Sequence, residues 1–413
     1  MEFSNEIINL TKEAEKALEE QFKKIDEIAF INTSKVMDAF RENRVSDSIF
    51  AGSTGYGYDD KGRETLDKVF AYMFDAPAAL VRHTIANGTA AISAGLYALL
   101  RPGDIMLSVT GKPYDTLLEA IGILGEEGNG SLKDFGVIYD EIELDGGKIN
   151  LSELEKKLSD KVKVVYIQRS KGYSTRPTLS SEEIGEVVSF VKKRSNAFVV
   201  VDNCYGEFCE TKEPTAYGAD LAIGSLIKNP GGGMALSGGY FAGSERAIEL
   251  VSYRLTSVGV GGEVGATLGQ SRDLFKGIFY APHTVAQALK TAHLAAYIFE
   301  KLGYEVSPKY NEARHDIIQT VQCGSGESLC AFCRGIQKGS PIDSFVTPEP
   351  WDMPGYADQV IMAAGAFVQG ASIELSADGP MREPYTVFFQ GGLTYESGKY
   401  GIMCAASEVG RKV

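Results

Sequence analysis

Residues 224–233 read G-S-L-I-K-N-P-G-G-G, and they follow the apolar residues L-A-I at 221–223. The apolar run predicts a buried strand over residues 221–226 that ends just before Lys228. An isolated ammonium group is costly to bury, because it must be paired with an anion or lose its charge. The glycines after it would let a backbone segment or a ligand approach closely. Taken alone, the stretch also fits a surface lysine at an ordinary strand-to-turn junction.

A second apolar run ends in a carboxylate. Residues 197–208 read A-F-V-V-V-D-N-C-Y-G-E-F, which predicts a buried strand that stops at Asp202. In open α/β sheets, ligands bind beyond the carboxyl ends of the strands, so a carboxylate there can meet a positive group on a ligand. A helix cap or a structural ion pair is the alternative role for Asp202. Two strands therefore deliver Asp202 and Lys228 to one edge of the predicted sheet.

The rest of the chain fits this sheet. Short apolar strands alternate with helical segments, which predicts an α/β fold whose central, mostly parallel sheet is covered on both faces. We expect strands at residues 79–82, 105–109, 135–139, 162–168, 197–202, 221–226 and 239–242. We expect three parts: an N-terminal helical arm and loop over 1–60, a large domain over 61–290 and a small α+β domain over 291–413. A helix is expected to begin at Pro282, and the arm either packs on a partner subunit or covers its own chain.

Composition excludes several classes of protein. The chain has 413 residues and a formal net charge of −14, which argues against a nucleic-acid surface and against anionic membranes. The N-terminus lacks the basic and apolar pattern of a signal peptide, so we expect a cytoplasmic protein. Cys330 and Cys333 form a C-x-x-C pair, but no second pair completes a four-ligand zinc site. We expect no metal there, only reduced cysteines in a loop.

Two further segments reach the same edge of the sheet. In T-I-A-N-G-T-A-A-I at 84–92, a strand stops and a helix begins near Asn87, Gly88 and Thr89. A helix N-terminus with exposed amides suits a phosphate group, although a plain capped helix is the alternative. Tyr114 sits at a similar junction and adds an aromatic ring. A lysine, a carboxylate, an aromatic ring and a phosphate-ready helix end are what pyridoxal 5'-phosphate requires.

These motifs carry a family resemblance. The stretches at 202–208 and 217–232 resemble the cysteine and methionine metabolism group of fold-type-I pyridoxal phosphate enzymes. Over nearly its full length the chain most closely resembles the methionine γ-lyase-like family of aluminium resistance proteins. G-Y-G-Y-D-D-K-G-R-E-T-L-D at 55–67, H-T-I-A-N-G-T-A-A-I at 83–92 and the segment 379–402 carry this closer likeness. The resemblance implies an aspartate aminotransferase-like fold, in which the large domain binds the cofactor.

The resemblance also implies roles for individual residues. Lys228 would hold the cofactor covalently and move protons, Asp202 would pair with its ring nitrogen, and Tyr114 would stack on the ring and assist the leaving group. Tyr56 or Tyr58 would reach into the active site of a neighbouring subunit, which implies a homodimer or homotetramer with shared sites. The implied phosphate contacts are Asn87, Gly88, Thr89 and Ser225. Arg382 is the candidate for the substrate carboxylate, because a guanidinium group binds a carboxylate through two hydrogen bonds.

Two departures from the family pattern concern the pocket. The hydroxyl residue before the family's lysine is Ile227 here, and no asparagine matching the family's cofactor contact is evident in residues 168–173. Arg169 or Ser170 is left to replace that asparagine. We predict a carbon–sulfur lyase that performs β or γ elimination on a small sulfur-containing amino acid of the cystathionine or methionine type. The alternatives are an aminotransferase or decarboxylase of the same fold, or a non-catalytic cofactor-binding regulator; a dehydrogenase ranks last, because no strand-linked G-x-G-x-x-G is present.

Overall fold

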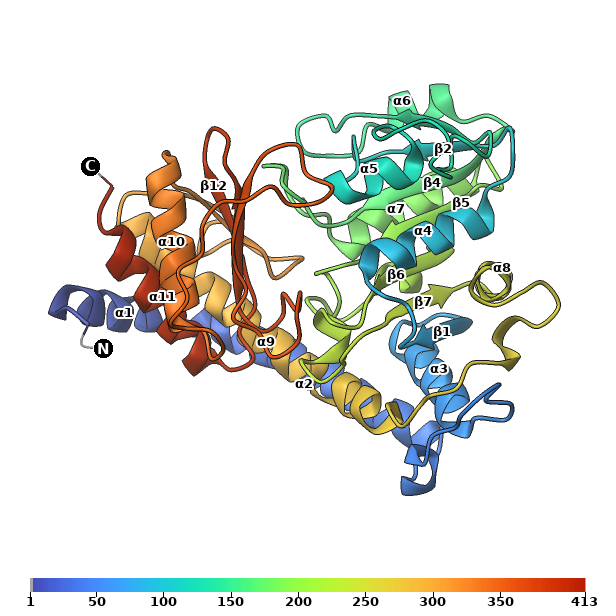
Figure 1. Ribbon diagram of the computed structural model, residues 1–413, viewed down its shortest axis with the longest axis horizontal. Coiled ribbons are helices and arrows are strands. Elements are labelled where there is room, and N and C mark those ends of the chain that lie inside the picture. The colour runs from blue at the N-terminus through green and yellow to red at the C-terminus, as the bar shows by residue number, and fades with distance from the viewer. Residues whose placement is uncertain (1–2, 413) are drawn as a thin grey trace.

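The computed structural model describes residues 3–412, and its larger part is built on a seven-stranded sheet (Figure 1). The strand order is β1-β7-β6-β5-β4-β2-β3; β7 runs antiparallel to β1 and β6, and the other neighbouring strands are parallel. The strands are β1 (Ala78–Arg82), β2 (Ile105–Ser108), β3 (Ile138–Glu141), β4 (Val162–Gln168), β5 (Phe198–Asp202), β6 (Leu221–Ser225) and β7 (Gly239–Gly243). The prediction of a mostly parallel sheet is therefore confirmed.

Helices cover both faces of this sheet because its strands are apolar on both sides. In β4, Val164 and Tyr166 pack with α4, α5 and α8, whereas Val165 and Ile167 pack with α6 and α7 on the opposite face. This alternation follows from the two-residue repeat of a strand. The helices are α4 (Gly88–Leu99), α5 (Asp115–Ile121), α6 (Leu151–Lys157), α7 (Ser181–Lys192) and α8 (Glu245–Leu255). The strands β2, β4, β5 and β6 run parallel to one another. Their carboxyl ends therefore lie at the same edge of the sheet.

A smaller antiparallel sheet forms the second part of the molecule, at the left of Figure 1. Its strand order is β10-β11-β12-β9-β8. The strands are β8 (Glu305–Ser307), β9 (Gln319–Gln322), β10 (Val360–Ala363), β11 (Ser376–Pro380) and β12 (Thr386–Gln390), and helices α10 (Gly326–Gly339) and α11 (Tyr395–Val409) pack against them. Cys330 and Cys333 are free thiols buried in α10, so the expectation that they lie in a loop was wrong.

One long helix, α9 (Ser271–Lys301), links the two parts and runs from one to the other in Figure 1. It begins well before the predicted start, and Pro282 lies inside it. The predicted domain boundary at residue 290 falls within this continuous helix and stays a prediction.

The N-terminal segment packs on its own chain. It forms helices α1 (Asn5–Ala17) and α2 (Glu19–Glu42), in agreement with the helical arm expected within residues 1–60. Ile7, Ala14 and Leu18 belong to the core of the small part, and α2 lies along α9. Ion pairs between Lys399 and Glu15 and between Lys290 and Asp26 accompany this packing. The arm was expected either to pack on a partner subunit or to cover its own chain. In this structure it packs on its own chain. No helix of residues 3–412 is long and apolar enough to cross a membrane.

The glycines after Lys228 serve packing. A side chain on Gly232 would collide with the carbonyl oxygen of Gly277 in α9, and one on Gly233 with Leu393. A Cβ on Gly277 would in turn lie 2.6 Å from the carbonyl oxygen of Gly231. From the sequence, either a backbone segment or a ligand was expected to approach these glycines closely. The structure shows a backbone segment, that of α9, against them. The close contact holds the turn after β6 rigidly against α9.

Candidate active site

Lys228 lies three residues past the end of β6, where the turn Asn229–Gly231 begins. Its Nζ lies 3.9 Å from the centroid of the Tyr205 ring. Burial alone would lower the pKa of Lys228, but the acidic groups of Cys204, Tyr205 and Asp202 face it and raise its pKa well above the ordinary value. The lysine is therefore enclosed by groups that stabilise a positive charge at this position.

Asp202 is the last residue of β5 and is buried. Its Oδ1 accepts a hydrogen bond from the backbone N–H of Cys204 at 3.1 Å, and its Oδ2 accepts one from Tyr166 Oη at 3.4 Å. Burial raises the pKa of Asp202, while Lys228 acts in the opposite direction. A buried carboxylate of this kind is stabilised by a positive group on a ligand.

The N-terminus of α4 lies beside the lysine. A Cβ built on Gly88 would lie 3.5 Å from Cys204 Sγ, 3.5 Å from Ser225 Cβ and 3.8 Å from Lys228 Nζ. Ser225 Oγ is buried and has no hydrogen-bond partner among residues 3–412. Asn87 caps α4, because its Oδ1 accepts the N–H of Ala90 at 2.8 Å. The absent side chain of Gly88 and the unpaired hydroxyl of Ser225 thus open a polar cradle next to Lys228.

Tyr114 precedes α5 and faces this cradle. Its Oη donates to Thr89 Oγ1 at 3.2 Å, and its backbone N–H donates to Gln168 Oε1 at 2.9 Å. Burial, and then the charge of Asp202, raise the pKa of Tyr114, so its hydroxyl stays protonated at neutral pH. The structure therefore brings together the predicted site residues Lys228, Asp202, Gly88, Thr89, Tyr114 and Ser225.

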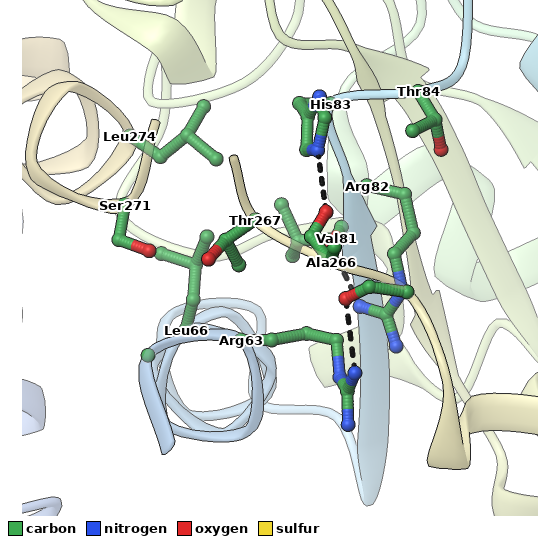
Figure 2. A pocket seen from close by; sticks show the side chains of 12 residues that line it. Arg63, Leu66, Val81, Arg82, His83, Thr84, Ala266, Thr267, Ser271 and Leu274 are labelled. Carbon is green, nitrogen blue, oxygen red and sulfur yellow. Dashed lines mark hydrogen bonds between the residues drawn. The ribbon is translucent and has the colours of Figure 1, made fainter. Parts of the chain in front are cut away.

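Tyr56 and Tyr58 lie on an exposed but well-anchored loop. Their side chains are 75% and 61% exposed, and their rings stack with centroids 5.6 Å apart. Beneath them, Arg63 donates to the carbonyl oxygens of Gly57 and Gly265 at 2.6 and 2.9 Å. Figure 2 shows the neighbouring segment 265–267, which we call the strap. Nε2 of His83 lies 2.8 Å from the carbonyl oxygen of Ala266 in this segment. Within this chain, both tyrosines are presented outward on a rigid base.

The small cavity drawn in Figure 2 is distinct from the site around Lys228. It lies between α3 (Lys61–Met73), β1 and the strap, and its volume is about 20 Å³. That volume holds about one water molecule and no organic ligand.

Two predicted arginines do not join the site. Arg169 is fully buried, and its guanidinium group donates to Asn203, Glu213 and Glu210. Arg382 lies between β11 and β12, is partly exposed, and pairs with Asp358 at 2.7 Å. The backbone N–H of Arg169 donates to the carbonyl oxygen of Asp202 at 3.1 Å. Among residues 3–412, neither arginine side chain forms a hydrogen bond or an ion pair with Lys228 or Asp202. Both assignments stay predictions.

The sequence did not single out Tyr205, Tyr173, Tyr356 or Asp378, four residues near the site. Tyr205 adopts a left-handed backbone conformation (φ 74°), which places its ring under Lys228. The Tyr173 ring packs at a tilt against the rings of Phe388 and Tyr356, with centroids 4.9 and 5.7 Å away, and its Oη donates to Asp378. Only Tyr205, inside D-N-C-Y, had a visible signal, namely its position next to Asp202.

Solved structures with this architecture are pyridoxal phosphate-dependent enzymes of fold type I, and that is the class to which this fold belongs. A pyridoxal 5'-phosphate dependent protein of Escherichia coli, at 15% identity, shares the fold with a TM-score of 0.62 over 92% of this chain and 95% of that chain.

The family follows from closer matches. The methionine γ-lyase family model matches residues 7–410, and the chain belongs to this family. A carbon-sulfur lyase involved in aluminium resistance from Clostridium novyi is 50% identical, with a TM-score of 0.95 over 98% of this chain and 96% of that chain. The protein YnbB of Bacillus subtilis is 51% identical over 94% of this chain and 93% of its own length. An L-methionine γ-lyase of Pseudomonas putida is 27% identical over 49% of this chain and 47% of its own length. The family and fold predicted from the sequence are confirmed.

Proposed function

We propose that this protein is a pyridoxal phosphate-dependent carbon–sulfur lyase that eliminates a thiol from a sulfur-containing amino acid. The observation that carries the proposal is the position of Asp202 and Lys228 at and just past the ends of neighbouring strands, beside Gly88, where an added Cβ would lie 3.8 Å from Lys228 Nζ. The same residues would serve an aminotransferase or a decarboxylase. Membership of the methionine γ-lyase family favours elimination.

The residues present fit this cofactor. The amides at Gly88 and Thr89 and the unpaired hydroxyl of Ser225 would hold its phosphate, because a helix N-terminus and a free donor both suit an anion. Asp202 would pair with its ring nitrogen, and Tyr114 would cover its ring. Lys228 would hold it covalently. When bound, the cofactor supplies an acceptor for the electrons released at the substrate Cα.

The protein residues supply proton transfer and enclosure. In its neutral form, Lys228 Nζ is the group placed to take the proton from Cα and to return it during elimination. The Tyr205 ring below Lys228 and the buried Tyr114 exclude water, which strengthens every charge interaction in the site. Tyr114 Oη keeps its proton and can donate a hydrogen bond toward the sulfur that leaves.

An absorption titration tests the proposal. Purified protein titrated with pyridoxal phosphate should turn yellow, and Lys228→Ala should lack that band. Lys171→Ala is the matched control, because Lys171 is another buried lysine near the end of β4 and should leave the band intact. Release of ammonia, a keto acid and a thiol from cystathionine or methionine separates a lyase from an aminotransferase, which releases no ammonia. A wild-type protein that stays colourless contradicts the proposal.

Ser225→Ala is expected to weaken pyridoxal phosphate binding by about tenfold. A hydrogen bond to a charged group contributes roughly 1.5–3 kcal/mol, and each 1.4 kcal/mol is a factor of ten in affinity. The stability of the free protein should not fall, because Ser225 Oγ is an unpaired buried hydroxyl there. Spectroscopic titration and urea unfolding measure the two quantities. Unchanged affinity would remove Ser225 from the phosphate site.

We further propose a cytoplasmic homodimer or homotetramer in which Tyr56 or Tyr58 completes the partner's site. The outward position of both rings on an anchored loop supports this. Light scattering that gives the mass of one chain would contradict it.

A further inference from the structure

A buried carboxylate with aromatic neighbours lies on a strand of the small sheet. Asp378 of β11 is 8% exposed. Its Oδ1 accepts a hydrogen bond from Gln390 Nε2 at 3.2 Å, and its Oδ2 accepts one from Tyr173 Oη. The Tyr173 ring lies 5.7 Å from that of Tyr356, and both tyrosines are only partly buried. We call Asp378, Tyr173 and Tyr356 the Asp378 cluster.

The Asp378 cluster belongs to the same pocket as Lys228. A Cβ built on Gly172, next to Tyr173, would lie 3.6 Å from Tyr114 Cβ. One built on Gly355, next to Tyr356, would lie 3.1 Å from Cγ2 of Thr116, whose hydroxyl lies 3.1 Å from that of Thr89. In agreement with this placement, the charge of Lys228 lowers the pKa of Asp378. Burial raises the pKa of Asp378 to about 6, so the group is a carboxylate at neutral pH. The cluster therefore borders the site that contains Tyr114, Thr89 and Lys228.

The cluster has spare capacity for a cation. A carboxylate offers about four acceptor positions, and two donors contact Asp378. No lysine, arginine or histidine of residues 3–412 forms an ion pair with it. Buried carboxylates are usually paired with a cation, and aromatic rings beside one add to its attraction for an ammonium group. Asp378 thus has the surroundings of an ammonium receptor.

We infer that the Asp378 cluster binds a second ammonium group on the substrate, so that the enzyme prefers a sulfur amino acid whose thiol fragment carries an amine. This inference rests on the proposed lyase function. A substrate with a plain alkyl group on sulfur, such as methionine, would leave Asp378 unpaired in the closed pocket. Sites built to bind a polar group discriminate strongly against ligands that lack it, because their own buried groups then stay unpaired. The cluster would therefore determine specificity without taking part in proton transfer.

The test compares two substrates of equal length on the holoenzyme: L-cystathionine and S-(3-carboxypropyl)-L-cysteine, which lacks only the far amine. We expect wild-type kcat/KM to be at least about tenfold higher for cystathionine. Asp378→Asn should lower kcat/KM for cystathionine by about 10–100-fold and leave the other substrate within about threefold. Asp358→Asn is the matched control, because that carboxylate is exposed and pairs with Arg382. It should leave the ratio unchanged.

A binding measurement complements turnover. L-Ornithine should inhibit the wild type more strongly than L-norleucine, which has the same length and no far charge, and Asp378→Asn should remove this difference. Equal kcat/KM for the two wild-type substrates, or equal losses in Asp378→Asn, would overturn the inference and leave the lyase proposal standing. A yellow enzyme that eliminates a thiol from neither substrate would instead contradict the lyase proposal.

Discussion

The Lys228→Ala variant should turn over its substrate about 10²–10⁴-fold more slowly than the wild type, even with saturating pyridoxal phosphate. That range is the usual contribution of one positioned acid or base. Lys228 is the amine adjacent to the Gly88 cradle, and the Tyr205 ring holds its Nζ in place at 3.9 Å. Truncation removes both the covalent attachment and the group that moves the proton. Single-turnover measurements of keto acid release give the rate.

Small amines can separate these two contributions. If Lys228 acts as a base, ethylamine in the buffer should restore part of the rate of Lys228→Ala, since it fits the space left by the removed side chain. Lys171→Ala, with a second buried lysine removed, should keep most of the activity and show no response to ethylamine. A Lys228→Ala variant with wild-type turnover would contradict the assignment of Lys228 as the catalytic amine.

The central sheet was predictable because its strands are apolar on both faces. β4, β5 and β6 are almost continuous apolar runs, and such runs are typical of buried parallel strands. The direction of β7 was not predictable, since Gly239–Gly243 has the same composition as a parallel strand. The helix start at Pro282 was misplaced because proline usually begins helices. Here Pro282 lies inside α9, whose Gly277 packs closely on the turn after β6.

The part of the site that lies at the ends of parallel strands could be predicted from the sequence. Lys228 and Asp202 meet because parallel strands end at a common edge, which the sequence pattern alone implies. Arg169 follows β4, but its side chain points away from Lys228, and its role at the cofactor stays a prediction. Side chains at successive strand positions point to opposite faces, so Gln168 contacts Tyr114 whereas Arg169 turns away to Asn203. Asp378 carried no local signal, because it reaches the pocket from an antiparallel strand of the small sheet.

The Arg169→Met variant is expected to lose about 3–5 kcal/mol of unfolding free energy. Arg169 is fully buried and donates to Asn203 Oδ1 at 2.8 Å, to Glu213 Oε2 at 3.3 Å and to Glu210. Methionine fills a similar volume but leaves two carboxylates without their cation. Of these, Glu213 is buried, and burial raises its pKa even with Arg169 present. Urea unfolding at pH 8 measures the loss.

The pH dependence of this loss identifies its origin. Without Arg169, the pKa of Glu213 should rise further, because its positive neighbour is gone. Protonation then removes the unpaired charge, so the loss should be smaller at pH 5 than at pH 8. Arg382→Met is the control: this partly exposed arginine pairs with Asp358, and exposed pairs contribute less than about 1 kcal/mol. Equal losses at both pH values would mean that packing around Arg169, and not the charge pairing, holds this corner of the large domain together.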